Sequence, residues 1–332
     1  MRSCVAIRRW WWRRASGPQP LAHPRPCRPS AQTLQTICPV PSAGGAPLST
    51  PPDRPDPSLL IIVPTLNSHQ LLPRLLASLR QQSWPHWQLL FIDGPSCPEH
   101  RRWLEQCCAA EPRCRWLAQD PDQPGIFGAM NQGFAAATAD WLLFWGSDDW
   151  AASPTVLAEA IAALRAAGPE APDLLVCRGR YVAAATGAPG RVTRFHGPGR
   201  LGAAAYRRAL LLGSTPPHQG TFFGPGARQR LARYAPDFRL AADLDYFLQL
   251  SVLPLRSPGS STPTALRVQC LDLELVQIAA GGISGQQPQR RLQEVRRAYR
   301  RAFGALWWCP FVARYLRRLA SLVPAASPSK HP

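Results

Sequence analysis

Short apolar segments that alternate with helical segments constrain this chain more than any other feature. Residues 59–63 form an unbroken apolar run followed by Pro64, which is typical of a strand buried on both faces. Leucines then recur at helical spacing over residues 71–79. Such alternation predicts a parallel sheet whose strands are joined by right-handed helical crossovers. The other elements expected in this half are strands at residues 88–92, 115–118 and 141–145, and helices at residues 98–109 and 128–138.

The pattern changes after residue 150. A helix is expected at residues 155–166, and the strand-like segments 174–184 and 191–195 are close enough in sequence to pair antiparallel. We therefore predict an α/β fold, with a Rossmann-like, mostly parallel sheet and a mixed C-terminal half. The remaining expected elements are strands at residues 219–223 and 267–278, and helices at residues 227–234, 241–252 and 289–302.

The formal net charge of +18 is carried mainly by the two ends of the chain. Residues 1–57 have a net charge of +6 and residues 290–332 one of +9, which leaves +3 for the centre. The single lysine, Lys330, argues against P-loop, kinase and Schiff-base chemistry, because each needs an internal lysine. A sequence pI of about 10.6 makes a nucleic-acid-binding protein an alternative function, although the nearly neutral centre argues against it.

Both ends are expected to differ from the central domain. Residues 1–57 are rich in Pro and Arg and are predicted to be a disordered extension, with a targeting segment or a mis-assigned start as the alternatives. Residues 290–332 are predicted to form a basic amphipathic helix and tail that contacts an anionic membrane. The alternative is a helix docked on the domain with a solvated arginine face, and Pro310 should kink or split it.

No apolar run approaches the ~18 residues that a membrane-spanning helix needs. The ten cysteines show no zinc-ligand spacing, and we interpret them as reduced thiols. We therefore expect a cytoplasmic protein, peripheral at the cytoplasmic membrane face if the basic helix binds lipid.

Acidic side chains follow three of the four strands expected in the first half. Asp93 follows the second strand, Asp120 and Asp122 follow the third, and Asp148 and Asp149 follow the fourth. Ligands of open parallel sheets bind beyond the carboxyl ends of the strands, so these acids should share one site. The first strand contributes Pro64, Thr65 and Asn67 to the same edge.

The adjacent carboxylates of Asp148 and Asp149 favour a bound cation. Mg²⁺ or Mn²⁺ suits such a place, because these ions take one or two protein carboxylates together with phosphate oxygens. A helix-capping role is the alternative, although Ser153 is better placed for it. The chain lacks a dinucleotide glycine fingerprint, a serine nucleophile elbow and an HExxH helix, which leaves a nucleotide site built on carboxylates and a metal.

Six motifs, in order along the chain, resemble family-2 glycosyltransferases of the GT-A fold. They are LIIVPTLN at residues 60–67, Asp93-Gly94 with Ser96, DQPGIFGAMNQG at residues 122–133, GSDD at residues 146–149, His218-Gln219 and AADLDYFL at residues 241–248. The similarity covers about residues 58–285 and is closest to the bacterial polysaccharide-biosynthesis branch, including the colanic-acid type. It implies a GT-A domain at residues 58–289 that moves a sugar, with inversion, from a nucleoside diphosphate sugar to an acceptor hydroxyl.

The resemblance also implies roles for the matched residues. Asp93 should bind the uracil or ribose end of the donor near Pro64 and Thr65. Asp149, more than Asp148, is the expected direct ligand of the divalent metal, Mg²⁺ or Mn²⁺. Further donor-nucleotide contacts are expected from Asn67, Asp122 and Asp148, and contacts with the acceptor or the diphosphate from His218 and Gln219.

Asp243 is implied to be the general base. A single base and an in-line displacement invert the anomeric carbon, while the metal neutralises the leaving diphosphate. Asp245 lies two residues further on, so on a helix only one of the two should face the site. An interaction of Asp243 with the helix dipole is the structural alternative, and the two roles are compatible.

The sequence departs from the family pattern at three places. Pro95 and the pair Cys97-Pro98 stand where relatives usually have Gly and Thr-Asp, and Ala242 stands where many have Glu. Residues 281–284 resemble a loop near the acceptor side, with a plain glycine turn as the alternative.

The expected partners are a UDP- or GDP-sugar and a saccharide or lipid-linked acceptor of polysaccharide or glycolipid biosynthesis, and not a nucleic acid. A metal-dependent nucleotidyltransferase built on the same carboxylates is the other alternative.

Overall fold

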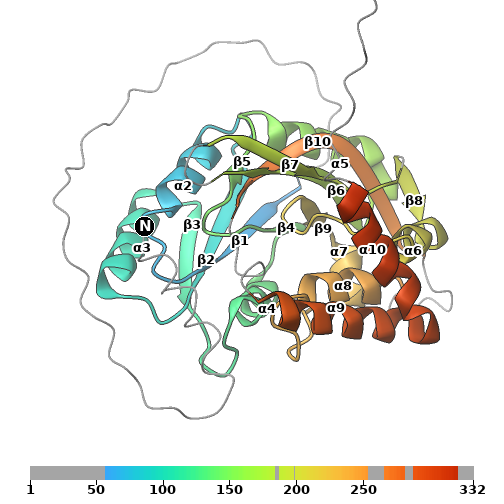
Figure 1. Cartoon of the computed structure of the whole chain (residues 1–332). Coiled ribbons are helices and arrows are strands. Elements are labelled where there is room, and N and C mark those ends of the chain that lie inside the picture. Colours follow the sequence, from blue (N-terminus) through green and yellow to red (C-terminus); the bar gives the residue numbers. More distant parts are fainter. Residues whose placement is uncertain (1–56, 184–186, 198, 253–264, 281–286, 321–332) are drawn as a thin grey trace, which may run out of the picture.

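A computed structural model describes residues 57–183, 187–197, 199–252, 265–280 and 287–320 (Figure 1). The predicted N-terminal extension up to residue 56, the glycine-rich segment at residues 281–284 and residues 321–332 lie outside the described residues. The described chain forms one ten-stranded sheet with helices on both faces, which confirms the predicted α/β fold.

The first half forms the predicted parallel sheet. β1 (Leu59–Thr65) lies between β2 (Trp87–Asp93) and β4 (Trp141–Phe144), and β3 (Cys114–Ala118) pairs with the other side of β2. The connections contain α2 (Leu72–Arg80), α3 (Pro98–Ala110) and α4 (Ile126–Ala136). β1 continues through Pro64, which was expected to end it. β4 pairs with β1 only as far as Ile62, so the missing N–H of Pro64 leaves no gap in that ladder.

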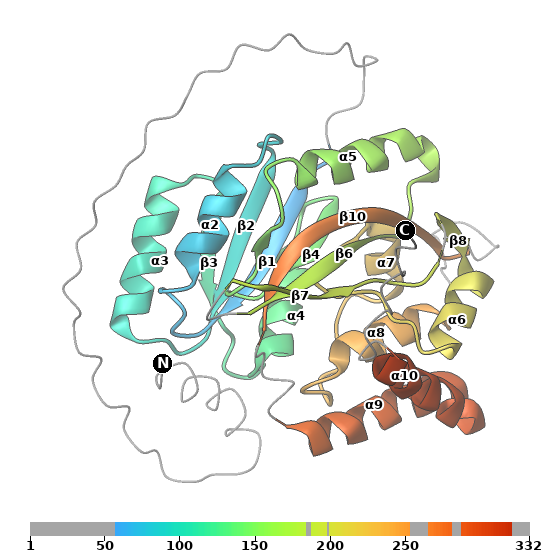
Figure 2. The same ribbon diagram turned by 45° about the horizontal axis from the view of Figure 1, so that its top comes forward.

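The second half is mixed, as predicted. β9 (Thr221–Phe223) is antiparallel to both β4 and β6 (Leu174–Val182), whereas β10 (Arg267–Ala279) runs parallel to β6. Figure 2 shows β10 as a long curved strand over this half of the sheet. The shorter strands are β5 (Trp150–Ala151), β7 (Pro189–Thr193) and β8 (Arg200–Gly202). The remaining helices are α5 (Val156–Ala167), α6 (Ala203–Leu211), α7 (Pro225–Arg230), α8 (Ala242–Leu250), α9 (Pro288–Phe303) and α10 (Trp308–Ala320), with short 3₁₀ turns η2 (Gly168–Glu170) and η4 (Gly304–Trp307).

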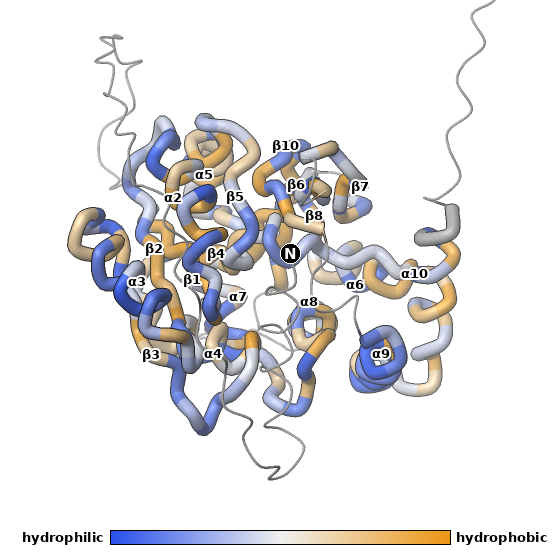
Figure 3. Tube along the Cα trace, turned by 60° about the vertical axis from the view of Figure 1, so that its left-hand side comes forward, coloured by the Kyte–Doolittle hydropathy of each residue, from blue (hydrophilic) through white to orange (hydrophobic). Residues whose placement is uncertain are grey.

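Alternate residues of β1 face two separate apolar layers. Leu59, Ile61 and Val63 pack with side chains of α2, α3 and α5, whereas Leu60 and Ile62 pack with side chains of α4, α6, α7, α8 and α9. All five are fully buried, which explains why the segment is a continuous apolar run rather than an alternating one. Figure 3 shows these hydrophobic strands enclosed between helices, and α9 as a mostly hydrophilic helix at the outside.

One predicted helix has different bounds, one helix was missed, and the break between the C-terminal helices lies elsewhere than expected. α7 starts at Pro225 and ends at Arg230, where residues 227–234 were expected, and an irregular segment then leads to α8. α6 was not predicted, because only Tyr206 and Leu210 of this short helix are buried and the apolar stripe is narrow. The C-terminal helices separate at Gly304, which has a φ of 54°, and not at Pro310. Pro310 lies in the first turn of α10, where a missing N–H is tolerated.

Candidate active site

The ends of β1 and β2 form a hydrogen-bonded network around Asp93. Thr65 and Asp93 are register partners, and Thr65 Oγ1 donates to Asp93 Oδ1 at 3.1 Å. Ser96 Oγ donates to the same oxygen at 2.6 Å and accepts from Asn67 N at 3.0 Å. Asn67 has a φ of 49°, a left-handed conformation that asparagine tolerates better than most residues. Pro64 pairs with Ile92 beside this network, so the structure brings Pro64, Thr65, Asn67 and Asp93 together.

His100 and Arg101, which the sequence did not single out, complete the surroundings of Asp93. The buried His100 ring places Nε2 3.1 Å from Asp93 Oδ1, and Arg101 Nε lies 3.9 Å from Oδ2. Oδ1 is therefore crowded by polar neighbours, whereas no described donor lies within hydrogen-bond distance of Oδ2. A signal for His100 was available, since it shares the buried face of α3 with Leu104 and Cys107 at helical spacing.

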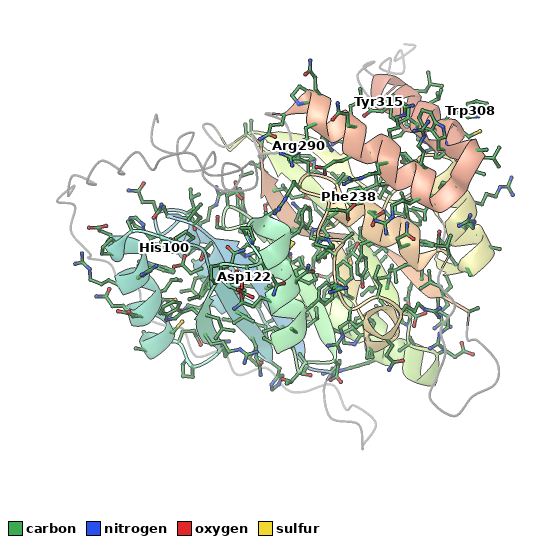
Figure 4. The ribbon with its side chains drawn as sticks, turned by 90° about the horizontal axis from the view of Figure 1, so that it is seen from below. His100, Asp122, Phe238, Arg290, Trp308 and Tyr315 are labelled. Carbon is green, nitrogen blue, oxygen red and sulfur yellow. The ribbon has the colours of Figure 1, made fainter. Side chains whose placement is uncertain are left out.

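Asp122 lies in an exposed loop that leads into α4 (Figure 4). Asp120 organises this loop: its Oδ1 accepts from Asp122 N at 2.9 Å and its Oδ2 accepts from Gln123 Nε2 at 3.0 Å. These two bonds lower the pKa of Asp120. The loop starts beside the Asp93 network, because Gln119 N donates to Asp93 O at 2.7 Å. The carboxylate of Asp122, however, contacts none of the other predicted residues within the described chain.

A tight turn after β4 holds Asp148 and Asp149. The Asp149 side chain is buried, and its Oδ2 accepts from Gly146 N at 2.6 Å. A Cβ atom at position 146 would lie 2.8 Å from Asp148 Oδ1 and 3.1 Å from Asp149 Oδ2, so both carboxylates face the space that this glycine leaves open. The capping alternative is wrong, because the N-cap position of α5 is Thr155, and neither the aspartates nor Ser153, which was expected to be better placed, occupies it.

This carboxylate pair is suited to a divalent ion that protein and substrate hold jointly. Within the described ranges, no group of three or more His, Cys, Asp or Glu side chains could hold a metal. Two converging carboxylates fit Mg²⁺ or Mn²⁺ when phosphate oxygens and water supply the other ligands. The seven cysteines in the described chain are all free.

His218 lies in an aromatic cluster between β4 and α8. Its ring stacks on Phe144, with centroids 5.6 Å apart, and its Nε2 is 2.7 Å from the Tyr234 hydroxyl. Burial lowers the pKa of His218, and the Asp243 carboxylate opposes this effect. His218 is therefore a neutral hydrogen-bonding ring at neutral pH rather than a cation. Tyr234 is fixed in turn by Asn131 of α4, whose amide pairs with the Tyr234 backbone at 2.7 and 3.0 Å.

Gln219 follows His218 in the sequence, just before β9, and lies in space beside the end of β4. Its backbone oxygen accepts from Trp145 Nε1 at 3.0 Å, and Trp145 N donates to Ile62 O at 3.1 Å. These bonds attach the segment of His218 and Gln219 to the strand ends that precede the Asp148–Asp149 turn.

α8 directs Asp243 and Asp245 to different surroundings, as their spacing predicted. Asp245 is buried and accepts from Arg301 Nη1 of α9 at 3.0 Å. Burial raises the pKa of Asp245 to about 6, and the charge of Arg301 opposes the rise. Asp243 is only partly buried, and its charge acts on both His218 and Tyr234 by raising their pKa values. Asp243 thus faces the aromatic cluster, and Asp245 faces α9.

Glu294 of α9 fixes the segment that leads to Asp243. Its Oε2 accepts from three consecutive backbone N–H groups, those of Arg239 at 3.0 Å, Leu240 at 2.7 Å and Ala241 at 3.0 Å. Arg239 Nη1 also donates to Pro124 O at 2.8 Å and so joins this segment to the Asp122 loop. Glu294 is 6% exposed and was missed, although it is the only acid in residues 290–332. A single acid in a segment rich in arginine was the sequence signal that could have identified Glu294.

Replacing Glu294 with alanine should lower the free energy of unfolding by about 3 kcal/mol, because three backbone donors, two of them buried, lose a charged acceptor. Urea unfolding measures this change. Glu170→Ala is the matched control: Glu170 forms an exposed ion pair with Arg200, and its loss should cost less than about 1 kcal/mol. Equal stabilities for the two variants would contradict the role given to Glu294.

Comparison with known proteins identifies similar sequences. Residues 60–209 match the sequence profile of glycosyl transferase family 2. An uncharacterized glycosyltransferase of Mycobacterium tuberculosis is 30% identical over 198 residues, which cover 59% of this chain and 70% of that protein. A PGL/p-HBAD biosynthesis glycosyltransferase of Mycobacterium bovis is 30% identical over 190 residues, covering 57% of this chain and 68% of that protein.

Solved structures share the fold at low sequence identity. S. aureus TarS 1–349 in complex with UDP-GlcNAc has a TM-score of 0.56 at 17% identity, covering 80% of this chain and 73% of that chain. Mannosyltransferase PcManGT from Pyrobaculum calidifontis, in complex with GDP-Man and Mn²⁺, has a TM-score of 0.52 at 14% identity, covering 81% and 76%. These likenesses confirm a fold of the GT-A type. With the sequence matches, they establish that this chain belongs to glycosyl transferase family 2.

Proposed function

We propose that this glycosyltransferase is a metal-dependent inverting enzyme that uses a nucleoside diphosphate sugar. The observation that carries the proposal is that the two acids of α8, Asp243 and Asp245, lie in different surroundings. Asp243 faces the aromatic cluster with no described hydrogen-bond partner, whereas Asp245 two residues on is paired with Arg301. A base must keep its carboxylate available to the acceptor hydroxyl, and of these two acids only Asp243 does so.

We propose that the other site residues bind different parts of the donor. Asp93 Oδ2 would accept an N–H or O–H of the nucleoside, beside Pro64, Thr65 and Asn67. Asp149, with Asp148, would hold Mg²⁺ or Mn²⁺, which when bound neutralises charge on the leaving diphosphate. Donor contacts from Asp122 and Asp148, and contacts of His218 and Gln219 with acceptor or diphosphate, belong to the same proposal.

The donor and acceptor are proposed by class. TarS 1–349 is in complex with UDP-GlcNAc and PcManGT with GDP-Man, which supports UDP or GDP as the nucleotide. The acceptor would be a saccharide or a lipid-linked sugar in polysaccharide or glycolipid synthesis, and the colanic-acid-like branch is part of this proposal. No helix in the described chain is long and apolar enough to cross a membrane. We place the enzyme in the cytoplasm, in peripheral contact with the membrane.

A thermal-shift screen of UDP- and GDP-sugars, with and without Mn²⁺, tests the proposal. We expect one nucleotide sugar to raise the melting temperature, and Mn²⁺ to increase the rise. With that donor and an accepting sugar, an α-linked donor should give a β-linked product and release nucleoside diphosphate. Release of pyrophosphate would instead identify a nucleotidyltransferase, and retention of anomeric configuration would refute inversion.

A further inference from the structure

The outward face of α10 is apolar. Trp308, Val312 and Leu316 are spaced four residues apart and lie on one side of the helix, with 55%, 46% and 59% of their surfaces exposed. Figure 4 shows Trp308 and Tyr315 at the outer edge of the molecule, far from His100 and Asp122. We call Trp308, Val312 and Leu316 the α10 stripe. Exposed apolar side chains gathered on one face mark a contact surface more often than scattered ones do.

The other faces of α10 are occupied by the enzyme itself. Arg314 Nη1 donates to Thr215 Oγ1 at 2.8 Å, and Arg317 Nε donates to Leu212 O at 2.8 Å. Pro310 is buried. Arg314 and Arg317, two of the arginines that suggested a solvated basic face in the sequence, therefore hold the helix in place, and the apolar stripe points outward. Leu212, whose backbone oxygen accepts from Arg317, lies on this docked side and is not part of the stripe.

Two arginines of α9 lie beside Trp307, the residue that precedes the stripe. The guanidinium groups of Arg296 and Arg300 lie 4.8 and 5.0 Å from the centroid of the Trp307 ring, just before α10. Both arginines are exposed, whereas Glu294, the only acid of α9 and α10, is buried under α9. Positive charge thus lies beside the N-terminal end of the stripe, and neither helix has an exposed acid.

We propose that the α10 stripe docks the enzyme on an anionic membrane surface, with Trp308, Val312 and Leu316 entering the interface and Arg296 and Arg300 contacting lipid phosphates. Apolar side chains with an adjacent basic border have the chemistry that such surfaces bind. A second copy of the chain is a poorer occupant, because a symmetric contact would bring the two arginine borders together. This inference gives the proposed membrane contact a place on the molecule. It rests on the proposed function only in explaining why the enzyme would bind a membrane.

Sedimentation with lipid vesicles tests the docking without any sugar transfer. The full chain should bind vesicles that contain phosphatidylglycerol, and bind phosphatidylcholine vesicles weakly. The double variant Val312→Ser, Leu316→Ser should bind the anionic vesicles about tenfold or more weakly. Leu117→Ser is the matched control: Leu117 is 39% exposed on β3, away from the stripe, and its loss should leave binding unchanged. Arg296→Gln with Arg300→Gln should weaken the binding and reduce its dependence on salt.

Three results would overturn the docking. They are wild-type binding by the double variant, equal binding of the wild type to both kinds of vesicle, and a dimer in solution that the double variant abolishes. Stabilisation of each variant by the nucleotide sugar, measured without vesicles, shows that it is folded. The same measurement separates failure of the docking from failure of the proposed function.

Discussion

Replacing Asp243 with asparagine should reduce the rate of sugar transfer by a factor of about 10² to 10⁴, because the carboxamide cannot take the proton of the acceptor hydroxyl. The fold should be unaffected, since no described side chain forms an ion pair with Asp243 and asparagine has the same shape. The rate constant for transfer at saturating donor, with circular dichroism as the check on folding, measures the effect.

Asp245→Asn is the control for that variant. It lies on the same helix, two residues away, and its amide oxygen can still accept from Arg301. Transfer should therefore remain close to that of the wild type. If Asp245→Asn were inactive and Asp243→Asn active, the base would be assigned to the wrong acid.

Asp149→Asn should abolish metal-dependent transfer, with a loss comparable to that caused by removing divalent ions with a chelator. Asparagine keeps an acceptor for Gly146 N, so the turn should remain intact. The variant should still be stabilised by free nucleotide, through Asp93, but the extra stabilisation by Mn²⁺ should be lost. Thermal shift and initial rates measure the two effects.

Asp148→Asn is the companion variant, and we expect a smaller loss because Asp149 is the proposed direct ligand. Wild-type activity in the presence of excess chelator would contradict the metal site. A larger loss for Asp148→Asn than for Asp149→Asn would exchange the two roles.

The sheet and its ligand edge could be predicted because the signals are local. Leu59–Val63 is buried on both faces and must be apolar throughout, and the acids that follow three of the four strands are visible in the sequence. Asp243 was found through the family resemblance, and its separation from Asp245 followed from helical geometry. The exposed Asp122 carboxylate shows the limit of this reasoning, since a strand end places a residue on an edge without fixing where its side chain points.

Long-range partners could not be predicted. Glu294 accepts hydrogen bonds from backbone groups more than fifty residues earlier in the chain. No sequence pattern around Arg239 indicates that this segment binds a distant carboxylate. The direction of α10 was also inaccessible, because its arginines have no sequence feature that distinguishes a bond to Thr215 or Leu212 from exposure to solvent. Both contacts depend on how whole helices pack.

The Glu294 contact also sets an order of events during protein synthesis. The strand ends that gather around Asp93 and Asp149 are all made before α8, whereas the segment before Asp243 obtains its acceptor only when α9 is translated. A nascent or proteolysed chain that stops before α9 would carry the proposed nucleotide-sugar contacts without a fixed base. We expect such a fragment to lack sugar transfer even though every strand-end residue of the proposed donor site is present in it.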